Sequence, residues 1–245
     1  MAQQTISHAD TFKAGDAKGP LLASDGTRGA NIMLPTVEVI AIPVAGAAAT
    51  ISAALATPAA GNLLIDGSGV GGAISGGVWT ATAARNLTIT SNNAGEVATV
   101  SVYGTDINGN LQGEVITFAA AATIVGKKTF KTVTRLALSA TALGTISVGT
   151  GSILGLKMRS IGLMRSTVEN NVVLTATGTF LPGSTTVQTA SNDDNRARYT
   201  PAAFTAEITV MYFPDLTKEG IGVGMTTRPG PNFVHSDQGN SNGAP

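Results

Sequence analysis

The sequence predicts an all-β protein, a sandwich or barrel of short antiparallel strands with an extended N-terminal arm and an irregular C-terminal tail. Three observations favour this fold class. Charged residues make up only 12% of the 245 residues, whereas hydrophobic residues make up 43%. The 30 glycines separate short apolar stretches that are rich in Val, Ile and Thr, which favour strands. Turn signals recur about every 8–12 residues, the spacing typical of β-sandwiches and barrels.

The N-terminal part of the chain is predicted to be an arm followed by an edge strand. Residues 1–35 contain recurring Gly and Pro and no lasting apolar period, so we expect an extended arm there. In TVEVIAIPV, which begins at residue 36, Val37 and Val39 share one face and Glu38 lies on the other. The proline of this stretch cannot donate a ladder hydrogen bond, so the strand is expected at a sheet edge. Residues 47–57 favour a short strand or irregular structure over a helix.

The middle of the chain carries a series of short strand signals between Gly and Asn turns. The strand signals that begin between residues 61 and 155 are NLLID, VWTATAA, NLTIT, VATVSVYGTD, EVITFA, KTFKTVTRLAL, TISVG and ILGLKM. We expect the apolar side chains of these strands to form a core. Residues 36–215 are therefore predicted to form one β-domain, or two subdomains that divide near residue 155.

The later part of the chain continues this pattern. Residues 170–181 are predicted to form a strand, and the polar stretch 191–201 is predicted to be an exposed loop. Residues 204–213 alternate regularly between two faces, which predicts a central strand that ends at Pro214. Residues 216–245 are rich in Gly, Pro and Asn and are predicted to form the irregular C-terminal tail.

The stretch VSVYGTDINGNLQGEVITF raises the question of a metal site. Asp106, Asn108 and Asn110 alternate as at the start of an EF-hand calcium loop. That loop requires Gly at its sixth position and Glu at its twelfth, where this chain has Leu111 and Thr117. We therefore interpret the stretch as a β-hairpin and not as a calcium site.

The hairpin interpretation predicts a register. Asn-Gly is the preferred pair for a type I′ turn, which would place Val102 opposite Val115. If SNNAGE closes the preceding loop, Leu87 lies beside Val100 and three consecutive strands form a meander. A slip of one residue would move the apolar side chains to the other face. The predicted apolar face consists of Leu87, Ile89, Ala98, Val100, Val102 and Val115.

Three glycine-containing motifs are weak candidates for chemistry. GSGVGG at 67–72 matches the dinucleotide-binding pattern, but the sequence after it favours strands and not a helix, which predicts a flexible loop. GTGSILG at 149–155 is predicted to be a Gly turn between strands. GNSNG at 239–243 matches the serine-hydrolase pattern without the strand-to-helix elbow that the reaction requires.

Catalytic and metal-binding side chains are scarce. The chain has no cysteine, and its two histidines, His8 and His235, lie in the predicted arm and tail. Asp193 and Asp194 could pair with Arg196 or Arg198, although a solvated loop explains these four residues equally well. No catalytic residue, cofactor or metal ligand is assigned, and we expect a protein that is not an enzyme.

The charge pattern also bears on partners. Fifteen basic and fifteen acidic residues give a net charge of zero, so nothing steers the protein towards nucleic acid. The basic stretch at 126–138 has one aromatic residue and is predicted to be a half-exposed strand, or one that touches an acidic partner. The most apolar stretch, at 37–60, is interrupted by Pro and Gly, so we expect no membrane span.

Four segments, taken in order, resemble a family of small structural proteins from the head-gene region of tailed bacteriophages, commonly taken as capsid decoration or cement proteins. The segments are RNLTITSNNAGEVATVSVYGTDINGNLQGEVITF, GKKTFKTVTRLAL, TISVGTGSILGLKM and RARYTPAAFTAEITVMYF. The resemblance implies a jelly-roll-like fold on the outer capsid surface of a virion. It also implies the major capsid protein as partner, together with copies of this chain in a trimer or dimer.

Two other functions are alternatives to capsid decoration. The first is a tail, neck or fibre component of the virion, which copy number would distinguish. The second is a carbohydrate-binding module for host attachment. That module would need an exposed aromatic platform, and Trp79 is the only tryptophan.

Overall fold

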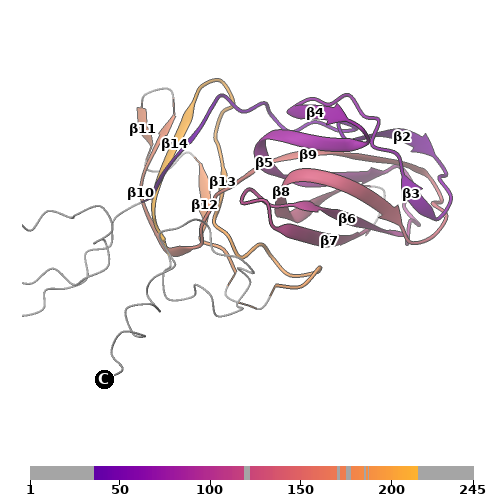
Figure 1. The fold of residues 1–245 in the computed structure, drawn as a ribbon. Coiled ribbons are helices and arrows are strands. Elements are labelled where there is room, and N and C mark those ends of the chain that lie inside the picture. The colour runs from indigo at the N-terminus through magenta and orange to yellow at the C-terminus, as the bar shows by residue number, and fades with distance from the viewer. Residues whose placement is uncertain are drawn as a thin grey trace, which may run out of the picture.

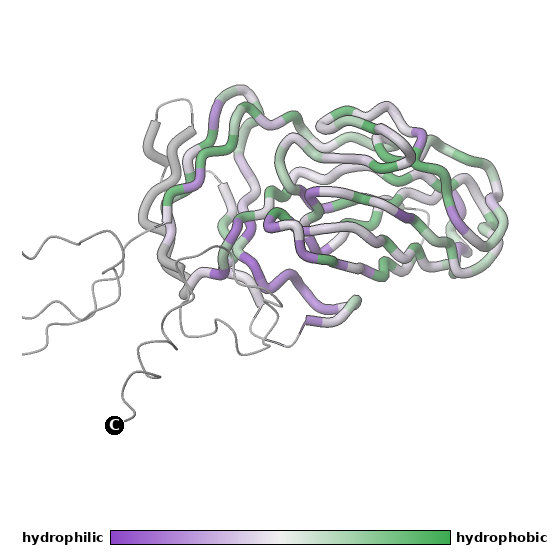
Figure 2. Tube along the Cα trace, viewed as in Figure 1, coloured by the Kyte–Doolittle hydropathy of each residue, from purple (hydrophilic) through white to green (hydrophobic). Residues whose placement is uncertain are grey.

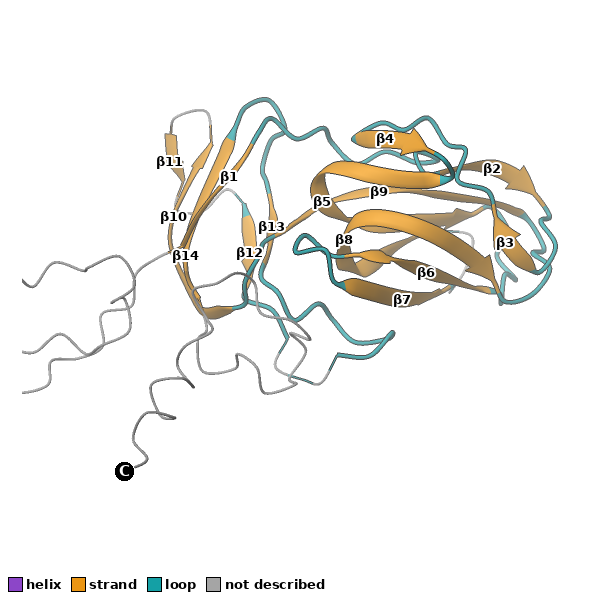
Figure 3. Ribbon diagram, in the orientation of Figure 1, coloured by secondary structure: helices purple, strands orange, loops and turns teal. Residues whose placement is uncertain are grey.

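The computed structural model describes residues 36–118, 122–169, 172–174, 178–184, 186 and 188–214. These residues form strands joined by turns and loops, which confirms the all-β prediction (Figure 3). No helix in these ranges is long and apolar enough to cross a membrane. The strands are β1 (Thr36–Ile40), β2 (Ser52–Ala56), β3 (Gly61–Leu63), β4 (Gly72–Ser75), β5 (Val78–Ser91), β6 (Thr99–Thr105), β7 (Leu111–Thr117), β8 (Thr123–Leu138), β9 (Thr145–Gly155), β10 (Ser160–Glu169), β11 (Val172–Leu174), β12 (Thr179–Leu181), β13 (Arg198–Thr200) and β14 (Ile208–Pro214).

The strands build two antiparallel sheets (Figure 1). The small sheet has the order β1-β14-β10-β11, and the large sheet has the order β12-β13-β9-β5-β8-β6-β7. Three short strands extend the large sheet, because β2 pairs with β9, β3 with β8 and β4 with β5. β12 and β13 lie where the two sheets meet, and β13 pairs with the carboxyl end of β9 (Figure 1). The jelly-roll arrangement and the division near residue 155 stay predictions.

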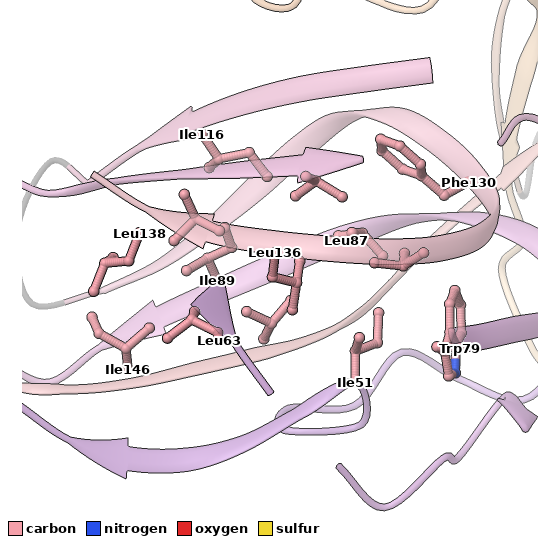
Figure 4. Close-up of a cluster of buried hydrophobic side chains, with 14 of the residues drawn as sticks. Ile51, Leu63, Trp79, Leu87, Ile89, Ile116, Phe130, Leu136, Leu138 and Ile146 are labelled. Carbon is pink, nitrogen blue, oxygen red and sulfur yellow. The ribbon is translucent and has the colours of Figure 1, made fainter. Parts of the chain in front are cut away.

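The core of the large sheet is one apolar cluster between strands that curve around it (Figure 4). Burial of each large side chain in such a cluster stabilises the fold by roughly 1.5–3 kcal/mol. The fully buried members that carry most of this area are Ile51, Trp79, Leu87, Ile89, Val100, Val102, Phe130, Val133, Leu136 and Val148. The large sheet therefore has a core of its own.

A second, smaller cluster joins the small sheet to β12, β13 and the end of β9. The inner face of β14 contributes Ile208, Val210 and Tyr212, as the alternation predicted. β14 lies between β1 and β10, so its predicted central position is confirmed, and β1 lies at the predicted sheet edge. On β1, Glu38 points inward, whereas Val37 is exposed.

The two ends of the described chain lie side by side. Thr36, the first residue of β1, pairs with Tyr212 near the end of β14. Residues 1–35 and 215–245 therefore attach to neighbouring strands at one end of the small sheet. The predicted arm and the predicted tail both lie outside the described residues.

The predicted three-stranded meander is wrong. β8 lies between β5 and β6, and its 16 residues are long enough to pair with both. The apolar face was largely right, since five of its predicted members are buried. Val115 is 37% exposed, however, and Ile116 takes its place in the core at 5% exposure. The predicted register was therefore off by one residue.

Some predicted boundaries were also wrong. The stretch 149–155 is not a turn but lies within β9. The strands predicted separately at VWTATAA and NLTIT form the single long β5. Gly151 allows the Asn86 side chain to pack directly against the backbone of β9, because a Cβ at this position would collide with the Asn86 amide. Of the strand predicted at 170–181, the described parts form β11 and β12, and the rest lies outside the described residues.

Candidate functional site at the junction of the two sheets

The turn between β6 and β7 is built around Asp106. The carbonyl oxygen of Asp106 accepts a hydrogen bond from Gly109 N at 3.1 Å, and its N–H donates to Asn110 O at 2.9 Å. Gly109 has a φ of +84°, whereas Asn108 does not have a positive φ. This is a type I turn followed by a left-handed glycine bulge, so the loop holds three residues. The hairpin is confirmed, but the predicted type I′ turn is wrong.

The Asp106 side chain explains why this turn type forms. Its carboxylate accepts hydrogen bonds from Asn108 N at 2.7 Å and Asn110 N at 2.9 Å, and from the Asn110 side-chain amide at 3.1 Å. Such Asx interactions favour a type I turn. The additional loop residue shifts the register by one, which turns Glu114 and Ile116 inward.

Arg196 neutralises the carboxylate at this turn. Its guanidinium donates to Asp106 and to the Gln112 side chain, and it lies 2.9 Å from Asp194 Oδ1. Arg196, Asp106 and Asp194 are all nearly fully buried. Two carboxylates thus share one guanidinium, and removing one partner of such a buried pair is strongly destabilising.

The edge segment, residues 188–198, covers the free edge of β7. Val115 N donates to Ala190 O at 2.9 Å. Lys128 Nζ donates to Gly113 O on β7 at 2.8 Å and to Thr189 O on the segment. The exposed loop predicted at 191–201 is therefore wrong over much of its length, since residues 194–199 are buried. The strand at 126–138 is half-exposed as predicted, but its Lys128 is 1% exposed.

Glu114 is a buried carboxylate beneath this segment. It accepts hydrogen bonds from the backbone N–H groups of Lys127 and Lys128. Burial raises the pKa of Glu114 to about 7, against those hydrogen bonds and the nearby Lys128 charge, which favour the ionised form. Burial likewise lowers the pKa of Lys128, and the charges of Glu114 and Asp194 oppose this shift.

Asp194 joins the edge segment to β8. Its Oδ2 accepts hydrogen bonds from the Thr129 N–H at 3.0 Å and the Thr129 hydroxyl at 2.9 Å. Asp194 Oδ1 accepts from Arg196 N at 3.0 Å. Arg198, the first residue of β13, donates to Lys127 O on β8. The four residues Asp193, Asp194, Arg196 and Arg198 therefore differ: only Asp193 is exposed, as a solvated loop predicts.

A second set of contacts connects the turn to the small sheet. The Asn108 side chain donates to Lys157 O at 3.0 Å, and Lys157 N donates to Glu38 Oε1 at 2.8 Å. Tyr212 donates its hydroxyl hydrogen to Glu38 and accepts from Met158 N at 3.1 Å. Burial raises the pKa of Glu38, and burial together with the Glu38 charge raises that of Tyr212. The backbone of Lys157 thus links both sheets.

Together these contacts form a polar network at the junction, called the brace below, which consists of Asp106, Arg196, Asp194, Asn108, Glu38 and Tyr212. Figure 2 shows hydrophilic stretches gathered where the two sheets meet. Within the described ranges, no three His, Asp or Glu side chains are placed to hold a metal ion. The Asp106 carboxylate instead bonds its own turn and Arg196. The arrangement fixes the position of one sheet against the other.

The remaining sequence motifs lie elsewhere. GSGVGG at 67–72 forms the predicted loop, which ends where β4 begins. Trp79 is fully buried and so cannot serve as an exposed sugar platform. His8, His235 and the stretch 239–243 lie outside the described residues.

A groove of about 450 Å³ lies over β5, β8 and β9. The Asn86 side chain in its lining already donates to Gly126 O at 3.2 Å and accepts from Ile153 N at 2.9 Å. None of the described residues that line the groove has a titratable side chain. The lining residues are Gly46, Ala47, Ala48, Asn86, Thr88, Thr123, Val125, Thr150, Gly151, Ser152 and Ile153.

Sequence reasoning missed the brace for an identifiable reason. In the sequence, Asp106 is explained by a hairpin turn and Arg196 by a solvated loop. Nothing in the residues next to either one indicates that the two side chains meet. One signal was available: Glu38 shares its strand face with Ile40, so one face of β1 had to combine a carboxylate with apolar side chains.

Comparisons with protein-family models, curated proteins and solved structures found no match for this chain.

Proposed function

We propose that this chain is a structural virion protein that decorates a tailed-phage capsid and stabilises it. It would sit on the outer capsid surface and bridge neighbouring major capsid protein subunits, in the company of further copies of itself as a trimer or dimer. The resemblance of the four segments within residues 85–213 supports this assignment. The stabilisation would come from contact area, without catalysis.

The observation that carries the proposal is the apolar edge strand β1. Val37 and Val39 are 51% and 59% exposed on its outer face, and Ile42 and Val44 follow at 63% and 45%. An edge strand also presents unpaired backbone groups that can pair with another chain. An exposed apolar edge of this kind is typical of a protein–protein contact.

The distribution of charge also supports an associating protein. Many of the charged side chains that the structure describes are buried and so contribute little to the surface. A surface with few charges is poorly soluble alone but suits contact with neighbouring proteins. The buried charged residues are Glu38, Arg85, Glu96, Asp106, Glu114, Lys128, Arg159, Asp194, Arg196 and Arg198.

The two ends of the described chain lie on the sheet that carries the β1 edge. Residues 1–35 and 215–245 attach beside the Thr36–Tyr212 pair, on the sheet whose edge is β1. Contacts made by these segments and by β1 would therefore fall on the same part of a neighbouring protein. Several weak contacts made by one molecule add multivalently.

Capsids with and without the protein test the proposal. We expect capsids that lack it to break at a lower temperature, and purified protein to restore the higher temperature. The double variant Val37→Lys/Val39→Lys should raise the breakage temperature less than the wild-type protein does. Leu111→Lys, at a side chain 90% exposed on β7, should raise it as much as wild type. Equal breakage temperatures with and without the protein would rule out a cement role.

A further inference from the structure

Arg85 on β5 is a buried cation without a carboxylate among the described residues. The side chain has no exposed surface, and its Nη1 donates to Val44 O at 2.8 Å. Its Nε and Nη2 are buried without a hydrogen-bond partner in the described part of the chain. Burial lowers the pKa of Arg85, with no neighbouring charge to oppose it. An uncompensated buried charge is costly, so a binding partner for this guanidinium would stabilise the fold.

Trp79 supplies a second buried donor without a partner, next to the same loop. Its Nε1 has no hydrogen-bond acceptor among the residues that the structure describes, and the ring stands at one end of the apolar cluster (Figure 4). A Cβ on Gly72 would lie 2.7 Å from Trp79 Nε1, and a Cβ on Gly71 would lie 3.0 Å from Arg85 Nη1. Two consecutive glycines therefore lie directly over both side chains.

The glycine loop at 67–72 is shaped for this close approach. Gly71 is buried and has a φ of +80°, which a residue with a side chain rarely adopts. Its carbonyl oxygen accepts hydrogen bonds from the N–H and hydroxyl of Thr82, each at 3.0 Å. Val70 beside it is 41% exposed, so the cover over Arg85 is a thin piece of backbone at the surface.

We propose that the loop at 67–72 covers a binding site for a small oxyanion, a phosphate or a carboxylate, held by Nε and Nη2 of Arg85, with the indole N–H of Trp79 as a further donor under the same loop. The Nε and Nη2 hydrogens of arginine form a fork that matches two oxygens of one anion. The indole N–H can only donate, so the unpaired nitrogens of Arg85 and Trp79 all require a hydrogen-bond acceptor. A water molecule would satisfy a donor without neutralising the charge. The anion enters when residues 70–72 lift.

A nearby lysine strengthens the positive potential. Lys131 Nζ donates to Ala81 O at 2.6 Å and to Thr82 O at 3.1 Å, on the part of β5 between Trp79 and Arg85. Neither of these acceptors carries a charge. The surroundings of the site therefore favour an anion over a neutral ligand.

Tryptophan fluorescence of the full chain tests the site directly, because Trp79 is the only tryptophan. Titration with sodium phosphate should give a saturable emission change that sodium chloride at equal ionic strength does not give. If the site accepts carboxylates, acetate should compete with phosphate for binding. If acetate does not compete, the site is specific for phosphate. Arg85→Lys, which keeps the charge and loses the fork, should bind phosphate about tenfold more weakly or worse.

The control is Arg135→Lys, a cation stacked on the Tyr103 ring outside the site, which should leave phosphate binding unchanged. Hydrogen exchange of the wild-type chain provides a test without a variant, since phosphate should slow exchange at residues 67–72. No saturable response of wild type to either anion, or an undiminished response in Arg85→Lys, would overturn the proposal.

Discussion

Arg196 and Asp106 lie ninety residues apart in the sequence and form a buried ion pair between the edge segment and the β6–β7 turn. Arg196→Met would leave Asp106 and Asp194 as two buried carboxylates without their shared cation. We expect the free energy of unfolding to fall by about 3–5 kcal/mol, the usual cost of breaking a buried pair. Urea denaturation followed by circular dichroism measures this loss.

Asp193→Asn is the matched control, because Asp193 lies in the same segment and is exposed. Its free energy of unfolding should stay within about 0.5 kcal/mol of wild type. A loss below about 1 kcal/mol for Arg196→Met would show that the ion pair does not fasten the edge segment to the β6–β7 turn.

Glu114 should make the stability of the protein depend on pH. Its pKa of about 7 in the folded state lies above the ordinary 4.5, so the folded state keeps a proton that the unfolded chain releases. The free energy of unfolding should therefore fall by roughly 3 kcal/mol as the pH rises from 4.5 to 7. Glu114→Gln cannot release this proton and should flatten most of the slope.

Denaturation midpoints at several pH values between 4.5 and 8 measure this slope. Glu207→Gln, at an exposed carboxylate, should keep the wild-type slope. Part of the slope should persist in Glu114→Gln, because burial also raises the pKa of Glu38. A Glu114→Gln slope equal to that of wild type would contradict the assignment.

Tyr212 should contribute to stability through its hydroxyl group as well as its ring. Tyr212→Phe removes one of the donors to the buried Glu38 carboxylate and the acceptor for Met158 N. We expect a loss of about 1–3 kcal/mol in thermal or urea unfolding. Tyr103→Phe on the exposed face of β6 should change stability little, and similar losses for the two variants would argue against this role of the hydroxyl.

Two glycines on neighbouring strands should differ sharply in their tolerance of a side chain. A Cβ on Gly104 would collide with the carbonyl oxygen of Thr132 on β8, whereas a Cβ on Gly113 would lie 3.5 Å from Val102 O. Gly104→Ala should therefore lower the unfolding midpoint strongly, and Gly113→Ala should change it little. The opposite order would show that β6 and β8 do not approach as closely as described.

The spacing of apolar residues was sufficient to predict the structure where burial depends only on neighbouring residues. The alternation of Ile208, Val210 and Tyr212 predicted the inner face of β14, and the regular turn spacing predicted the all-β class. Pro43 similarly indicated that β1 lies at an edge. These features depend on a few consecutive residues and on backbone chemistry.

Features that depend on distant residues could not be predicted in this way. The Asn-Gly pair favours a type I′ turn, but the Asp106 carboxylate stabilises a three-residue loop instead. That single additional residue moved Val115 outward. The buried state of Arg196 depends on Asp106, Gln112 and Asp194 together, whereas its own segment is polar throughout.

A three-dimensional reconstruction of virions that contain this chain tests the proposed function most directly. We predict on the order of hundreds of copies on the outer capsid surface, with Val37 and Val39 of β1 against the shell or a neighbouring copy. A few copies, about 3–12, in a ring at the neck or tail would contradict capsid decoration.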